Sequence, residues 1–100
     1  MRREPPIRFE WDEKKARQNA KKHRVSFEEA QSVFADIYAR LIPDPDHSDD
    51  EERFILLGMS DKLSTLVVCH CYRQQDSVIR LISARLANRH EKTMYEEHLK

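Results

Sequence analysis

Three consecutive runs decide the fold: RFILLGMS (Arg53–Ser60), LSTLVVCHCYR (Leu63–Arg73) and SVIRLISAR (Ser77–Arg85). Their apolar, aromatic and β-branched composition is typical of β-strands. The breaks between them, Asp61-Lys62 and Gln74–Asp76, are too short for a crossover connection. We therefore expect three sequential strands joined as antiparallel hairpins.

The segments around these runs predict further strands and helices. Alternation over Ile7–Trp11 indicates a short strand, and Tyr38–Ile42 indicates another. Three capping signals open helices: Asp12 before Glu13–His23, Ser26 with Glu29, and Asn88 with Glu91. The first two helices are joined by only a few residues, so we expect a helical hairpin. The predicted order is β-α-α-β-β-β-β-α, an α+β fold with an antiparallel sheet, an N-terminal helical hairpin and a C-terminal helix.

Length and composition limit the possible functions. The chain has 100 residues, with 18 Lys+Arg balanced by 18 Asp+Glu, and we expect one domain over residues 1–100. Gly58 is its single glycine, which excludes Walker loops, dinucleotide fingerprints and nucleophile elbows, since each needs several glycines. No apolar run is long enough to span a membrane, and Met1–Pro6 is not followed by the apolar core of a signal peptide. We expect a cytoplasmic protein, with no membrane partner, whose Cys69 and Cys71 are reduced thiols.

Spaced blocks of residues over residues 7–97 carry a family resemblance. They are Phe9-x-Trp11-Asp12-x-x-Lys15-Ala16-x-x-Asn19-x-x-Lys22-His23, Val25-Ser26-Phe27-Glu28-Glu29-Ala30-x-x-Val33-Phe34, Glu52-Arg53-x-x-x-x-Gly58-x-Ser60, Arg80-x-Ile82-Ser83-Ala84-Arg85 and Tyr95-Glu96-Glu97. In this order they resemble the BrnT-type toxins of bacterial type II toxin–antitoxin pairs. Two positions depart from the family pattern, because Arg24 and the turn Gln74–Asp76 stand where the family usually has glycine.

The resemblance implies a fold similar to the RelE and ParE toxins and an endoribonuclease activity that halts translation. It also implies a cognate BrnA-type antitoxin with a ribbon-helix-helix DNA-binding part. The complex of the two would repress its own operon, so the toxin would meet operator DNA only through the antitoxin. An alternative of a different class is a binding module, a catalytically weak partner of such a DNA-binding protein that acts in autoregulation.

Arginines of the last two strands are the candidate catalytic residues. Metal-free RNA cleavage needs a base for the 2′-OH, cations for the phosphorane-like transition state and an acid for the leaving oxygen. Arginine suits the second role, because its planar fork binds phosphate through two hydrogen bonds. We expect catalytic roles for Arg73 and Arg85, which could serve different phosphates or the antitoxin, and a milder role for Arg80.

The turn sets the expected faces of these arginines. If Gln75-Asp76 is its centre, Arg73 and Arg80 share one sheet face. Arg85 then lies on the other face with Tyr72 and His70, although a one-residue shift would change this pairing.

Three further residues have both a functional and a structural interpretation. His70 is a possible general base, because histidine titrates near neutral pH, but it equally fits a core histidine with one backbone hydrogen bond. Lys22 and His23 are possible RNA contacts, although a cation at the end of a helix is also favoured by the helix dipole.

Two apparent metal motifs fail on spacing, so we expect no metal and no cofactor. In Cys69-His70-Cys71 the strand period separates the imidazole from both thiols, which prevents a common zinc site. His90–Met94 begins like a zincin motif, but Met94 stands where the second histidine is required.

Overall fold

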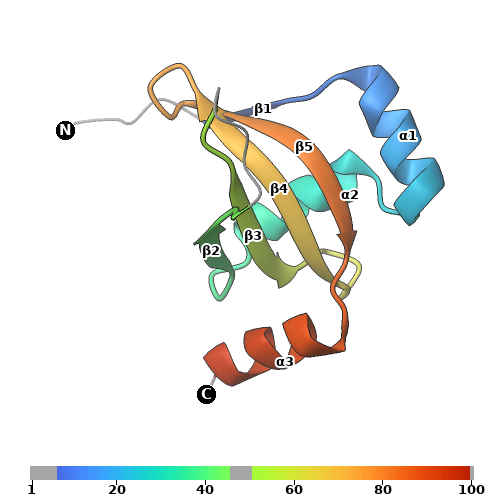
Figure 1. Cartoon of the computed structure of the whole chain (residues 1–100), viewed down its shortest axis with the longest axis vertical. Helices are drawn as coiled ribbons and strands as arrows, with labels where there is room; N and C mark the ends of the chain where they lie inside the picture. The colour runs from blue at the N-terminus through green and yellow to red at the C-terminus, as the bar shows by residue number, and fades with distance from the viewer. Residues whose placement is uncertain (1–6, 46–50, 100) are drawn as a thin grey trace.

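The computed structural model describes residues 7–45 and 51–99, which form a five-stranded sheet with helices on both faces (Figure 1). The elements in chain order are β1 (Arg8–Glu10), α1 (Glu13–His23), α2 (Phe27–Ser32), the 3-10 turn η1 (Val33–Ala35), β2 (Arg40–Pro43), β3 (Phe54–Met59), β4 (Thr65–Arg73), β5 (Val78–Leu86) and α3 (Arg89–His98). This confirms the α+β class and the predicted order of strands and helices. No helix of the described ranges is long and apolar enough to cross a bilayer.

The sheet has the strand order β1-β5-β4-β3-β2. Strands β3, β4 and β5 are antiparallel neighbours, as the short connections predict. Strand β2 also pairs antiparallel with β3. The expectation of a wholly antiparallel sheet is wrong at one edge, because β1 runs parallel to β5, with Glu10 opposite Arg80. No hairpin turn joins these two strands, which are separated by 70 positions in the chain, so nothing local fixes an antiparallel direction.

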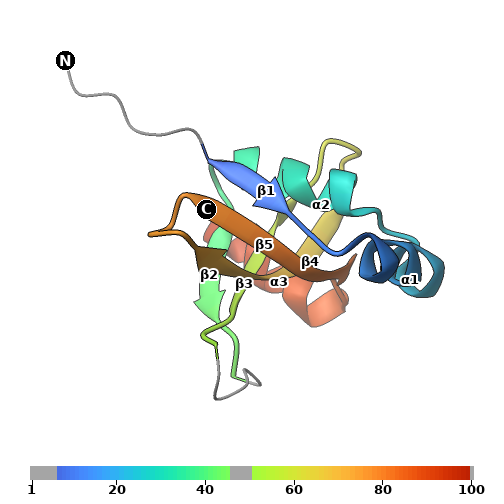
Figure 2. The ribbon, with the colours of Figure 1, turned by 90° about the horizontal axis from the view of Figure 1, so that it is seen from above.

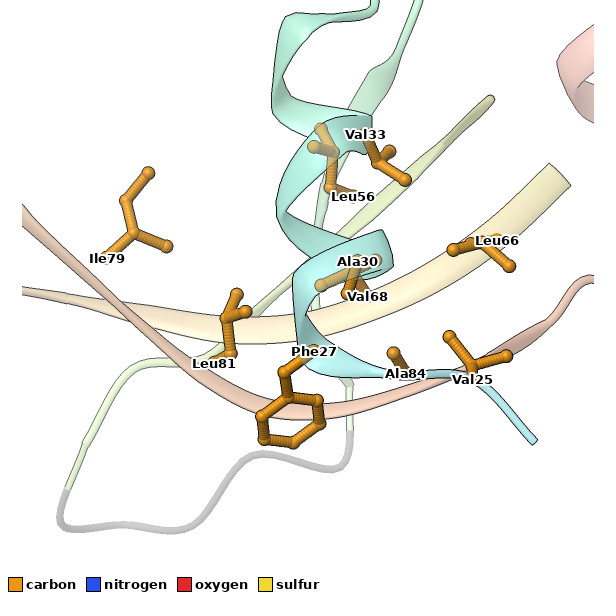
Figure 3. Packing of buried hydrophobic residues seen from close by; sticks show 10 residues of the cluster. All are labelled: Val25, Phe27, Ala30, Val33, Leu56, Leu66, Val68, Ile79, Leu81 and Ala84. Carbon is orange, nitrogen blue, oxygen red and sulfur yellow. The ribbon is translucent and has the colours of Figure 1, made fainter. Parts of the chain in front are cut away.

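Two hydrophobic cores lie on opposite faces of the sheet. The larger core joins α2 and the segment before it to β3, β4 and β5 (Figure 3); its buried members are Val25, Phe27, Ala30, Val33, Leu56, Leu66, Val68, Ile79, Leu81 and Ala84. The smaller core, on the other face, packs Tyr95 of α3 against Leu57, Val67 and Ala87. Figure 2 shows α2 and α3 on the two sides of the sheet. Strand β4 therefore contributes to both cores, with Leu66 and Val68 in the larger one and Val67 in the smaller one.

The first two helices do not form an antiparallel pair. In Figure 1 the axes of α1 and α2 run in clearly different directions. Buried Asn19 explains the position of α1, because its side chain bonds both the carbonyl oxygen (2.8 Å) and the backbone N–H (3.0 Å) of Ala84 on β5. The short link between the helices passes through Arg24, which adopts a left-handed conformation with φ 59°. The expected helical hairpin is thus two helices with separate docking sites.

A β-bulge interrupts the ladder between β4 and β5. Leu81 is opposite His70, whereas Ser83 is opposite Cys69, so Ile82 is an extra residue of β5. An extra residue shifts the two-residue alternation of a strand by one position. Beyond the bulge, side chains of β5 therefore point to the face opposite to the one that simple alternation predicts.

The bulge overturns one expectation about the candidate arginines. Near the turn the register is as predicted, and Arg73 and Arg80 share a face. Arg85, however, points to the same face as these two and not to the face of His70 and Tyr72. All three candidate arginines consequently lie on the face that α3 partly covers.

Candidate functional site

Charged side chains gather on the α3 face of the sheet, at the end next to the β4–β5 turn. The strand register sets them in two neighbouring rows across β4, β5 and β1: Cys71, Arg80, Glu10 and then Arg73, Val78, Arg8. Paired residues point to the same face, and adjacent rows on one face are about 7 Å apart along the strands. We call Arg8, Glu10, Arg73 and Arg80 the arginine cluster.

Each arginine of the cluster is held by an acceptor. Arg80 donates from Nη1 to Oε2 of Glu10 at 2.8 Å. Arg73 donates from Nη2 to Oε2 of Glu51 at 2.8 Å, and the exposed Arg8 donates to the side-chain oxygen of Gln74 at 2.8 Å. The side chains of Arg73 and Arg80 remain 45% and 32% exposed. These guanidinium groups are thus oriented in advance and still open to an external anion.

Two thiols lie beside the cluster and stay protonated. Burial raises the pKa of the Cys69 thiol to about 12, helped by its contact with Asp44. Burial also raises the pKa of Cys71, and Glu51 adds to this rise. The pKa of Arg73 is raised by its hydrogen bond with Cys71 and by Glu51, with a smaller contribution from Glu10. Both cysteines are free thiols and are therefore poor nucleophiles at neutral pH.

Arg85 lies at the opposite end of the same face. It forms a two-pronged ion pair with Glu91 of α3, at 2.7 Å and 2.8 Å. The hydrogen bond from Glu91 raises the pKa of Arg85, and Arg85 in turn lowers the pKa of Glu91. The residues opposite Arg80 and Arg85 on β4 are Cys71 and Val67, four positions apart, which corresponds to about 13 Å along a strand. In this arrangement Arg80 and Arg85 therefore do not bind one phosphate together.

His70 lies in the core on the other face of the sheet and is fully buried. Its Nδ1 is 3.1 Å from the carbonyl oxygen of Val68 and must donate to it, so Nε2, 3.2 Å from the Tyr72 hydroxyl, accepts. The ring also meets Phe34 edge to face, at a centroid distance of 4.9 Å. Burial lowers the pKa of His70, and the bond to Val68 only partly opposes this shift. The imidazole is therefore neutral and faces no solvent.

Lys22 and His23 lie in the last turn of α1, away from the arginine cluster. They border a shallow cavity with Ile82 and Ser83, the bulged part of β5. The structure therefore gives them a separate surface of the molecule and does not bring them together with Arg73 or Arg80.

The comparison with known proteins agrees with the sequence resemblance. Residues 11–91 match the family described as the ribonuclease toxin BrnT of type II toxin–antitoxin systems. The chain belongs to the BrnT family. Its fold is similar to the crystal structure of the Brucella abortus ribonuclease toxin BrnT, with a TM-score of 0.62 and 22% identity over 83% of this chain and 99% of that one. No curated protein sequence matches the chain.

The sequence of this BrnT-family chain did not predict that two members of the arginine cluster, Arg8 and Glu10, belong to the candidate site. Arg8 and Glu10 were assigned to a strand, and their alternation with Phe9 already placed them on one face. The missing information was the neighbour of that strand, since only the pairing of β1 with β5 brings Glu10 to Arg80.

The described residues of this BrnT-family chain offer no ready metal site. Within residues 7–45 and 51–99, no group of three or more His, Cys, Asp or Glu side chains is arranged to hold a metal ion. Around Cys69, His70 and Cys71 the reason is visible, because the two thiols and the imidazole lie on opposite faces of β4 as the alternation predicted.

Proposed function

We propose that this BrnT-family chain is an endoribonuclease that cleaves RNA without a metal ion and so inhibits translation. The observation that carries this proposal is the arginine cluster, in which three guanidinium groups share an open sheet face with one carboxylate. Cationic groups oriented in advance are what a phosphorane-like transition state requires, because its charge exceeds that of the phosphodiester.

The arginines have different roles in this proposal. Arg73 and Arg80 bind the scissile phosphate, exchanging Glu51 and Glu10 for phosphate oxygens at similar distances. Arg85 contacts a different phosphate of the same RNA, because it lies about 13 Å from Arg80 along the sheet. Lys22 and His23 remain candidate RNA contacts on a second surface. We assign His70 to the core, because a fully buried ring has no surface to offer to RNA.

The partner in this proposal is a BrnA-type antitoxin with a ribbon-helix-helix DNA-binding part. Membership of a type II toxin–antitoxin family supports a protein antitoxin, and the arginine face gives an acidic or apolar segment a surface to cover. Operator DNA is contacted through the antitoxin only. The toxin acts in the cytoplasm, where its RNA substrate is translated, and it needs no cofactor.

A second candidate function is a catalytically weak binding module that takes part only in autoregulation. The observation that favours it is that Arg73, Arg80 and Arg85 each have a carboxylate partner at 2.7–2.8 Å. In this alternative the ion pairs persist, and the arginine face serves only to hold the antitoxin.

A cleavage assay separates the two functions. The purified toxin is mixed with a defined RNA in excess EDTA, and a copy of the RNA with 2′-deoxy sugars serves as the control. We expect cleavage of the RNA alone, at a rate unchanged by the chelator. Loss of activity in EDTA with recovery on adding zinc or magnesium would show that a metal is required. A folded toxin that binds its antitoxin but cuts no RNA would establish the binding module.

A further inference from the structure

The proposed cleavage still lacks a group that removes the proton from the attacking 2′-OH. Arginine cannot do so, because it stays protonated at every accessible pH. The base must lie on the same face as Arg73 and Arg80, reach the solvent and keep an oxygen available. We propose that Glu10 is this base, an assignment that rests on the proposed ribonuclease function.

The sheet holds Glu10 beside the phosphate-binding arginines. Glu10 lies directly opposite Arg80 in the parallel pairing of β1 with β5, and its Oε2 accepts a hydrogen bond from Arg80 at 2.8 Å. Its influence also reaches Arg73, whose pKa is raised by Cys71, by Glu51 and to a smaller degree by Glu10. A carboxylate on a paired strand is positioned better than one on a loop.

The exposure of Glu10 suits contact with a substrate. Its side chain is 39% exposed, more than those of Glu51 (30%) and Glu91 (21%). Among the described residues, its carboxylate accepts a hydrogen bond only from Arg80 and only through Oε2. The second oxygen, Oε1, therefore remains available to take a proton.

The other carboxylates near the arginines are less suited to this role. Glu91 uses both oxygens on Arg85, and one of them also accepts the backbone N–H of Asn88. Its lowered pKa, caused chiefly by Arg85, makes it a weaker base. Glu51 is shared between Arg73 and the Cys71 thiol. Of these three carboxylates, Glu10 thus has the fewest competing partners.

The reaction follows from this arrangement. A phosphodiester bound by Arg73 and Arg80 takes over the hydrogen bond from Arg80, which frees the Glu10 carboxylate. Glu10 accepts the 2′-OH proton while the 2′-oxygen bonds to phosphorus, and the bond from phosphorus to the 5′-oxygen breaks. Water protonates the leaving 5′-oxygen, and the hydroxide formed takes the proton from Glu10. The products are a 2′,3′-cyclic phosphate and a 5′-hydroxyl end.

Glu10→Gln tests the assignment, because glutamine keeps the size and still accepts a hydrogen bond from Arg80 but cannot accept a proton. Single-turnover cleavage is measured against pH for wild type, Glu10→Gln, Glu10→Asp and Glu28→Gln. Glu28 is an exposed glutamate of α2, on the other side of the sheet, and is the matched control. We expect Glu10→Gln to cut about 100- to 10,000-fold more slowly, the usual contribution of a general base.

The pH profile distinguishes a base from a residue that merely positions Arg80. A carboxylate base must be ionised, so the wild-type rate falls on the acid side. We expect this fall to disappear in Glu10→Gln and to persist, at a lower rate, in Glu10→Asp. Glu28→Gln should match the wild type throughout.

Two results would overturn the assignment. One is a folded Glu10→Gln variant that cuts within about threefold of the wild type, and the other is a slow variant that keeps the wild-type acid limb. Either would leave the ribonuclease function standing, since the wild type would still cut RNA. A wild type that cuts nothing would instead overturn the proposed function, and the role of Glu10 with it.

Discussion

The two ends of one sheet face differ in what covers them. At the turn end, Arg73 and Arg80 remain accessible beside Glu10. At the other end, Leu57 and Val67 are buried under α3. Strand β4 alternates in the same way at both ends. Its alternation therefore does not explain why one end is buried and the other is a candidate site. The difference lies in where α3 docks.

A buried hydrogen bond contributes to that docking, in addition to the ion pair of Arg85 with Glu91. The buried Tyr95 of α3 donates from its hydroxyl to Oδ2 of Asp36 at 2.6 Å. The same oxygen accepts the backbone N–H of Met59, and Oδ1 accepts that of Tyr38. Asp36 therefore ties α3 to β3 and to the loop before β2. The comparison teaches that, on this face of the sheet, the buried packing is concentrated under α3, while the turn end is free to serve function.

The largest effect is expected at the turn end. Arg73→Ala or Arg80→Ala should slow RNA cleavage about 100- to 1000-fold, because each removes a donor to the transition state. The melting temperature should hardly change, since an exposed ion pair contributes at most about 1 kcal/mol. Single-turnover kinetics and thermal unfolding measure the two effects.

The lysine variants are the control for charge. Arg73→Lys keeps the charge but loses the planar fork, so it should restore only part of the rate. Arg85→Ala should be milder than either cluster variant, since both terminal nitrogens of Arg85 are already bonded to Glu91. Wild-type cleavage by both folded alanine variants would remove the arginine cluster from the chemistry.

The covered end should respond in the opposite way. Leu57→Ala should lower the free energy of unfolding by about 2–5 kcal/mol, because it leaves a cavity under α3. The cleavage rate per folded molecule should remain at the wild-type level. Urea unfolding and an activity assay at low temperature test this pair of expectations. A large loss of cleavage by the folded protein would show that the two ends are not independent.

Tyr95→Phe should have a smaller effect that depends on pH. Burial raises the pKa of Asp36, but hydrogen bonds from Tyr95, Met59 and Tyr38 outweigh it and hold the pKa below its ordinary value. A lowered folded pKa stabilises the protein above the unfolded value, and this contribution disappears as the pH falls through the folded pKa. Removing the Tyr95 hydroxyl should cost about 1 kcal/mol at pH 7 and less in acid. Urea unfolding at pH 7 and pH 3 measures the difference, and equal losses at both pH values would contradict it.

The smallest effect is expected at the strained turn that supports the arginine cluster. Gln74, Gln75 and Asp76 all have positive φ, at 51°, 56° and 68°. Gln75→Gly should stabilise the protein by up to about 1 kcal/mol, because glycine adopts this conformation without strain. Arg24→Gly is the matched variant at a left-handed position outside this turn, with φ 59°. Calorimetry should show a higher melting temperature for both variants, and a lower one would show that the native side chains there offset the strain.

Local patterns predicted the secondary structure well, because each strand and helix is encoded in its own residues. The hairpins from β3 to β5 and the three helix caps were visible for that reason. Two features were not visible in the sequence, because they depend on contacts between residues that are far apart in the chain. The parallel pairing of β1 with β5 brings Glu10 to Arg80, and the bulge at Ile82 turns Arg85 to the face of Arg73. The candidate site was therefore predicted only in part.

The sequence from Leu81 to Ala84 does not by itself show that a bulge lies there. Leu81 and Ala84 both face the larger core, although they are three positions apart. With simple alternation from Leu81, Ser83 and Arg85 would point into the larger core. The extra residue Ile82 turns both side chains to the other face, so these polar groups are not buried in that core. The position of the bulge depends on the residues that pack against the sheet, and those residues lie far away in the chain.

The parallel pairing of β1 with β5 also has a consequence for the order of events during synthesis. Glu10 and Arg80 are 70 positions apart, so a growing chain makes one long before the other. A ribosome that has released β1 but not β5 carries a nascent polypeptide in which the arginine cluster does not yet exist. The site is thus assembled only after β5 has been made and has paired with β1. Under the proposed ribonuclease function, a nascent chain that lacks β5 therefore cannot cut RNA through this site.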